Sequence, residues 1–168
     1  MVATQGTADR PLTTLALHRS QDVAAVPELA FAAICEVEKW PNWLSFLKTA
    51  RRLDAGPLRL GSEVAIRSAI PGAEEELYEV DTFLDGYILS LVGAYSVRRR
   101  FDFRIERKSD RSKLVVKLDY PSYGGVIGAL VDRMTARRKL DAALADSLIH
   151  FKGLVEYSVE RDEILADF

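Results

Sequence analysis

Hydrophobic and polar positions follow different periods in successive parts of the chain. Thr14–Val23 is a strand candidate. The apolar segment at residues 28–38 follows Pro27, whose fixed φ suits the first turn of a helix. Apolar residues cover more than half of this helix, which places it between other elements. After a break at residues 39–43, apolar spacing over residues 43–47 predicts a second short helix.

From Thr49 to Tyr120 the period is two, and glycine, proline and aspartate separate the segments. Six strands are predicted, over residues 49–54, 63–70, 75–83, 87–93, 97–106 and 113–120. Because the breaks between them are short, these strands form hairpins. Together with the first strand they predict a seven-stranded antiparallel sheet.

A long amphipathic segment follows the sheet. No proline interrupts residues 126–155, and apolar residues recur there every three or four positions. The stripe includes Leu140, Leu144, Leu148 and Phe151. A helix of about 30 residues spans roughly 45 Å, which is enough to cross the whole sheet.

Length and composition fit one α+β domain. The 168 residues are 48% hydrophobic and 29% charged, the balance of a folded globular chain. We expect the domain over residues 13–158, with a flexible leader at residues 1–12 and a tail at residues 159–168. The net charge of −2 gives no basic field, so no nucleic-acid partner is expected.

Localisation follows from the cysteine content and from the N-terminal residues. Cys35 is the one cysteine, which excludes an internal disulfide and fits a reducing compartment. The N-terminal residues lack the apolar region of a secretory signal, and no window is apolar enough for a membrane span. We expect a cytoplasmic protein without stable membrane insertion.

Short motifs along the chain indicate a family. Residues 23–28 (VAAVPE) close the first strand, residues 38–43 read EKWPNW, and residues 56–61 read GPLRLG. The turn at residues 85–86 and a glycine-rich segment before the last helix support them. On these residues the chain from about 15 to 156 resembles the START-like or SRPBCC superfamily, especially its polyketide cyclase/dehydrase and lipid-transport branch. The resemblance implies a helix-grip fold, a curved antiparallel sheet around the long helix, with a deep pocket between them for a hydrophobic small molecule.

Alternation selects the residues that would line this pocket. The expected ligand-binding residues are Val64, Ile66, Ser68, Val80, Ser90, Phe101, Phe103, Tyr120, Leu140, Leu144, Leu148 and Phe151. The strand phase that carries Val80 also carries Glu76 and Tyr78, and the phase of Phe101 includes Arg99. The sequence therefore predicts an apolar pocket with three polar side chains on its wall.

Glu76, Tyr78 and Arg99 predict acid-base chemistry. An aldol-type ring closure needs a base that removes a proton beside a carbonyl and a donor that holds the resulting oxyanion. Glu76 would be the base, with Tyr78 or Arg99 as the donor. Alternatively, Glu76 belongs to the acidic run at residues 74–76 and Arg99 to an exposed basic cluster at residues 98–100, since charged residues are seldom buried.

His150 is a further candidate base. It lies beside Phe151, one step off the helix stripe, and helix curvature would have to turn it toward the pocket mouth. His18 is the other histidine, on the first strand. Neither has companions at metal-ligand spacing, so no metal is expected, and a structurally neutral role is the alternative for both.

Three functions remain open on these observations. The first is a polyketide cyclase-like enzyme that orients a hydrophobic polyketide-type substrate and promotes its aldol-type or dehydrative cyclisation. The second is a non-catalytic carrier or binding protein for a lipid, quinone or similar molecule. The third is a protein-interaction role of the outer sheet face. No nucleotide or metal motif is visible, so no cofactor is expected, and a homodimer is compatible with the sequence.

Overall fold

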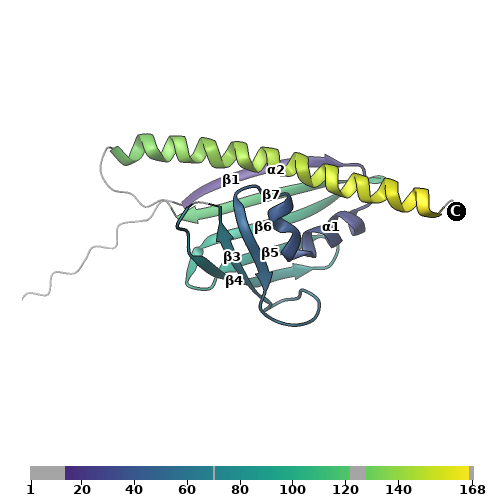
Figure 1. The fold of residues 1–168 in the computed structure, drawn as a ribbon, viewed down its shortest axis with the longest axis horizontal. Helices are drawn as coiled ribbons and strands as arrows, with labels where there is room; N and C mark the ends of the chain where they lie inside the picture. The colour runs from purple at the N-terminus through teal and green to yellow at the C-terminus, as the bar shows by residue number, and fades with distance from the viewer. Residues whose placement is uncertain (1–13, 70, 122–127, 167–168) are drawn as a thin grey trace, which may run out of the picture.

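A seven-stranded sheet and a long C-terminal helix form the body of the protein (Figure 1). The structure is a computed structural model that describes residues 14–69, 71–121 and 128–166. Its elements are β1 (Thr14–Val23), α1 (Pro27–Cys35), the 3-10 helix η1 (Val37–Asn42), β2 (Leu47–Arg52), β3 (Glu63–Ser68), β4 (Glu75–Leu84), β5 (Ile88–Gly93), β6 (Ser96–Lys108), β7 (Arg111–Pro121) and α2 (Gly128–Ala166). The strands pair antiparallel in the order β1-β7-β6-β5-β4-β3-β2, which confirms the predicted fold class.

Helix α2 runs along the sheet on the side of β1 and extends past the strands at both ends (Figure 1). Its 39 residues span about 58 Å. Arg19 of β1 donates through Nε to Asp141 Oδ1 at 2.9 Å, and the Ala24 amide donates to Glu156 Oε1 at 2.7 Å. Two separate polar contacts therefore hold the helix along the first strand.

The C-terminal boundary of α2 differs from the expectation. Residues 159–166, expected as part of a tail, continue the helix, and Val159 is partly buried against the core. The apolar stripe thus extends one turn further than the sequence analysis assigned it. The expected leader at residues 1–12 falls outside the described residues.

The expected second helix at residues 43–47 is wrong. The second short helix is η1, which directly follows α1, and Leu47 already begins β2. The apolar spacing has another cause, since Trp43 and Leu44 are buried in the core from a turn. Trp40 of η1 fastens the end of α1, because its Nε1 donates to the carbonyl of Ile34 at 2.8 Å.

An extra residue in β4 changes the phase of that strand. Val80 lies opposite Leu91 of β5, whereas Phe83 lies opposite Leu89, with the register shifting between Val80 and Thr82. Leu89 and Leu91 lie on one face of β5, so Val80 and Phe83 share a face although three residues separate them. We call this face, which α1 and α2 cover, the concave face.

Aromatic side chains fill the middle of the concave face. The Trp40 ring lies 5.2 Å from Phe103, and the Trp43 ring lies 4.8 Å from Phe151 of α2, measured between ring centroids. Phe103, Phe151 and Trp40 are almost fully buried. This cluster joins η1, β6 and the C-terminal half of α2 into one core.

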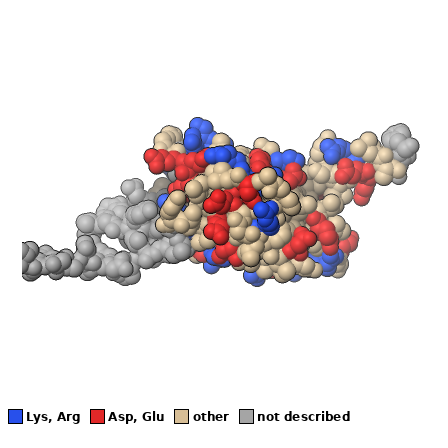
Figure 2. Space-filling view, turned by 90° about the horizontal axis from the view of Figure 1, so that it is seen from below, with Lys and Arg blue, Asp and Glu red and all other residues tan. Residues whose placement is uncertain are grey.

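The outer surface carries mixed charge. Figure 2 shows acidic side chains in several clusters on one face of the molecule, with basic side chains between them. No broad basic surface is visible on the described part of that face. Over the described ranges, no helix is both long and apolar enough to cross a lipid bilayer.

Candidate functional site

The first residues of β4 and β6 bring three polar side chains together on the concave face. The Tyr78 hydroxyl donates to Glu76 Oε2 at 3.1 Å. Glu76 Oε1 forms an ion pair with Nη1 of Arg99. One carboxylate therefore accepts from both a phenol and a guanidinium, and we call this set the polar triad.

Gly93 explains how two strands that are not adjacent can meet. β5 lies between β4 and β6, and Gly93 at its end lies opposite Tyr78. Because Gly93 has no side chain, the Tyr78 ring reaches Phe101 of β6, with ring centroids 5.3 Å apart in an edge-on arrangement. Neighbouring strands are about 4.8 Å apart, so the backbones of β4 and β6 are separated by roughly twice that distance. The two side chains extend toward each other over the end of β5 and make contact there.

The polar triad lies where the buried core gives way to solvent. Val64, opposite Tyr78 on β3, is fully buried, whereas the side chains of Glu76 and Arg99 are 41% and 30% exposed. Ile66, opposite Glu76, continues the apolar wall with only 4% exposure. The triad therefore has an apolar wall on one side and water on the other, as a site that captures an apolar ligand by a polar end requires.

Burial controls the protonation of Tyr78. The residue is 5% exposed, and loss of solvation raises the pKa of its phenol to about 12. At neutral pH the hydroxyl is therefore a neutral hydrogen-bond donor.

Most of the expected apolar residues lie on the concave face, at different depths. Val64, Ile66, Val80, Phe101, Phe103, Leu144, Leu148 and Phe151 belong to the buried core cluster, and Leu140 packs against it in part. Leu144, Leu148 and Phe151 are at most 2% exposed, and the Phe151 ring contacts Trp43. These deep residues pack into the core beneath α2, where the resemblance implied a pocket.

Among the other expected site residues, Ser90 lies on the opposite face of the sheet from the one expected. Ser90 lies opposite Asp102, on the face away from Leu89 and Leu91, because strict alternation in β5 turns it to the convex side. Ser68 is half-buried at the end of β3, where its hydroxyl lies 3.5 Å from the Phe46 carbonyl. The side chain of Tyr120 falls outside the described residues.

His150 does not join the polar triad. It is exposed and lines a shallow surface hollow of about 340 Å³ with Asn42, Ile149, Gly153 and Leu154. Its neighbour Phe151 faces the core, and one step along a helix turns the next side chain by about 100°, which directs His150 outward.

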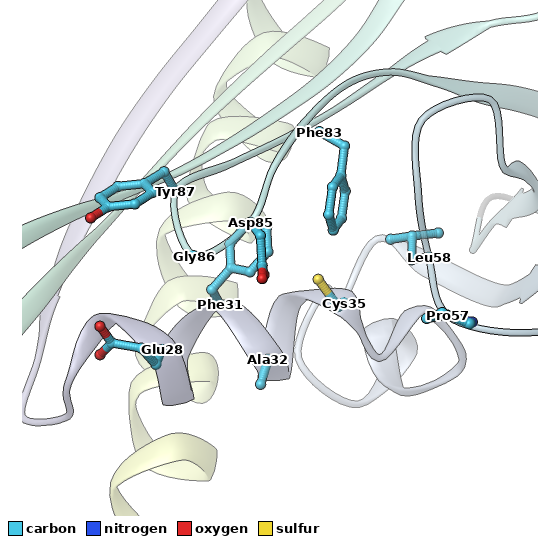
Figure 3. Close-up of a pocket in the computed structure, with 10 residues that line it drawn as sticks. All are labelled: Glu28, Phe31, Ala32, Cys35, Pro57, Leu58, Phe83, Asp85, Gly86 and Tyr87. Carbon is cyan, nitrogen blue, oxygen red and sulfur yellow. The ribbon is translucent and has the colours of Figure 1, made fainter.

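A larger hollow lies at the other end of β4, between α1 and the β4–β5 turn (Figure 3). It has a volume of about 400 Å³. Phe31, Cys35, Leu58 and Phe83 contribute apolar surface, and Glu28 and Asp85 contribute carboxylates. We call it the α1 groove. Neither this hollow nor the one at His150 lies between α2 and the sheet.

Sequence reasoning missed both Gly93 and the α1 groove. The position of Gly93 at the end of a predicted strand is the one signal in the sequence that another side chain could approach the backbone there. Strict alternation from Val80 assigns Phe83 to the face away from the α1 groove, because alternation alone does not reveal the extra residue in β4. Within the described ranges no group of three or more His, Cys, Asp or Glu residues is arranged to hold a metal ion.

The curled sheet gripping a long C-terminal helix defines a helix-grip protein of the START/Bet v 1-like class, and solved structures share it. The Zhui aromatase/cyclase from Streptomyces sp. R1128 superposes with a TM-score of 0.69 at 13% identity, covering 88% of this chain and 96% of its own. A START superfamily protein from Mycobacterium smegmatis gives a TM-score of 0.58 at 21% identity, covering 84% and 97%. TTHA0849 from Thermus thermophilus gives 0.67 at 12% identity, covering 86% and 99%. These likenesses establish the fold.

The sequence supplies the family. Residues 14–156 match the model of the family described as polyketide cyclase/dehydrase and lipid transport. The chain therefore belongs to that family, as the motifs in its sequence indicated. No curated protein matches the chain in sequence.

Proposed function

We propose that the protein binds a polyketide-type chain at the polar triad and promotes its aldol-type cyclisation. The observation that carries the proposal is that Tyr78 and Arg99 both contact the Glu76 carboxylate at the solvent edge of an apolar wall. A carbonyl-bearing, mostly apolar chain matches this combination of surfaces. Membership of the polyketide cyclase/dehydrase family supports the choice of substrate class.

The polar triad supplies the groups that the reaction requires. Glu76 takes a proton from a methylene between two carbonyls, and Arg99 and Tyr78 donate hydrogen bonds to the enolate oxygen that forms. The enolate carbon forms a bond to a second carbonyl carbon, whose oxygen becomes an alkoxide and takes up the proton held by Glu76. Where dehydration follows, a second α-proton and the hydroxyl leave together as water.

A carrier is the second candidate, and one observation favours it. The Glu76 carboxylate already accepts a hydrogen bond from the Tyr78 hydroxyl and is paired with the Arg99 guanidinium, so its negative charge is stabilised without a ligand. Hydrogen bonds to a carboxylate stabilise its charged form, which makes it a weaker base. In a carrier of a lipid or quinone, the same three groups would only hold the polar end of the ligand.

Proton exchange separates these two functions. The probe is a β-ketothioester with an aryl tail, whose methylene exchanges hydrogen for deuterium in D₂O. We expect the wild type to accelerate exchange, and Glu76→Gln to lose at least about tenfold of that acceleration while binding is retained. Glu79→Gln is the matched control, because Glu79 is an exposed glutamate of the same strand with the opposite phase.

A second variant tests the location of the site. Gly93→Leu places a side chain between Tyr78 and Phe101, and it should abolish both binding and exchange. Binding without accelerated exchange, together with a lipid or quinone that copurifies in native mass spectrometry, would overturn the enzyme in favour of the carrier. Binding that survives Gly93→Leu would remove the polar triad from both functions.

A further inference from the structure

The α1 groove is separate from the polar triad. Phe83 and Asp85 contribute to it from the end of β4 and its turn, whereas Glu76 lies near the start of the same strand. Seven residues of extended chain between Glu76 and Phe83 correspond to about 23 Å. The buried Phe31 lies on the core side of the groove, so the core stands between the two sites.

We propose that the α1 groove binds an amphipathic amine, an apolar molecule of moderate size that carries one ammonium group. Its volume of about 400 Å³ lies within the range of small-molecule sites. Phe31 and Phe83 offer aromatic surface, with ring centroids 5.7 Å apart in an edge-on arrangement. Leu58 and Cys35 complete the apolar lining.

The charge of the groove selects a cation. Its lining contains two carboxylates, Glu28 and Asp85, and no lysine or arginine. Glu28 is already matched, since Arg107 donates to its Oε1. Asp85 makes no hydrogen bond or ion pair within the described part of the chain. The negative charge of the Asp85 carboxylate therefore remains available to pair with a cationic ligand.

Asp85 acts on the interior of the groove. Figure 3 shows its carboxylate directed from the β4–β5 turn toward α1. Burial and, after it, the charge of Asp85 raise the pKa of the Cys35 thiol to about 11. The carboxylate is thus close enough to influence a group on the groove wall, and an ammonium ion there would also face the aromatic rings.

Three matched probes test the charge selection. They are 2-(2-naphthyl)ethylamine, which is a cation at pH 8, the neutral 2-(2-naphthyl)ethanol, and the 2-naphthylacetate anion. We expect the amine to bind about fivefold more tightly than the alcohol at low salt, and the anion most weakly. Asp85→Asn should bring the amine to the affinity of the alcohol, whereas Asp146→Asn, which changes an exposed aspartate on α2, should leave the order unchanged.

Cys35 reports where the probe binds. Because the chain has one cysteine, modification by methyl methanethiosulfonate reads out a single site, and the bound amine should slow it. Ala32→Phe, which fills the groove from an exposed position on α1, should abolish binding of the amine. Equal affinity of the three probes, an unchanged affinity in Asp85→Asn, or binding that leaves Cys35 unprotected would overturn the proposal. Glu76→Gln should not affect the amine, which separates this result from the fate of the polar triad.

Discussion

Replacing Tyr78 by phenylalanine removes one hydroxyl from the polar triad and little else. The hydroxyl donates to Glu76 Oε2 at 3.1 Å. A hydrogen bond to a charged acceptor contributes about 1.5–3 kcal/mol, but the Glu76 side chain is 41% exposed and water replaces part of the loss. We expect Tyr78→Phe to lower the free energy of unfolding by about 1 kcal/mol at pH 8.

Alkaline pH should remove this difference. Burial raises the pKa of Tyr78 from 10.0 to about 12. Between these values the unfolded chain has lost the phenolic proton and the folded chain retains it. The contribution is thus fully present below pH 10 and is lost as the pH rises through about 12. At pH 11 the wild type has lost about 1.4 kcal/mol by this linkage, and the phenylalanine variant has lost none of it.

Urea unfolding at pH 8 and pH 11, followed by tryptophan fluorescence, measures both values. The variant should be less stable than the wild type at pH 8 and equal to it or slightly more stable at pH 11. Tyr157→Phe is the control, because Tyr157 is 67% exposed on α2 and should show no pH-dependent difference. A stability gap of the same size at both pH values would refute the coupling between burial and ionisation of Tyr78.

Two further predictions concern the core and the α1 groove. Trp40→Phe removes a donor that lies 2.8 Å from the buried Ile34 carbonyl, and it should cost about 1–2 kcal/mol more than Trp43→Phe, which loses ring contacts alone. Equal costs in urea unfolding would show that the hydrogen bond is not stabilising. Alkylation of Cys35 should accelerate about tenfold per pH unit up to a pH near 11, because the thiolate is the reactive form. A rate that levels off near pH 9 would contradict the raised pKa of Cys35.

The fold could be predicted from the sequence because its local patterns agree with one another. The strand expected over Thr14–Val23 is β1, and the stripe of Leu144 and Leu148 on α2 faces the protein core as its spacing indicated. Residues 43–47 misled because burial in a turn produces the same apolar spacing as a helix. Periodicity reports which residues are buried, and the hydrogen bonds of the backbone decide the element.

The polar triad could be predicted in part. Alternation placed Glu76 and Tyr78 on one face of β4 and Arg99 on the corresponding face of β6. Their direct contact could not be predicted, because it depends on β5 ending at Gly93 between the two strands. For His150 the sequence already contained the answer. Its place on the helix, next to the core-facing Phe151, turns its side chain away from the core.

The extra residue in β4 has a consequence for how the protein can change over generations. Deleting Asp81 would restore strict pleating and leave Phe83 on the concave face, because Val80 and Phe83 would then be two positions apart and Phe83 would still lie opposite Leu89. Glu76 and Tyr78 precede that point and would keep their orientation. Loss of a single codon would therefore leave the side chains of both binding surfaces on their present face, so β4 can change in length between the two sites without turning either of them.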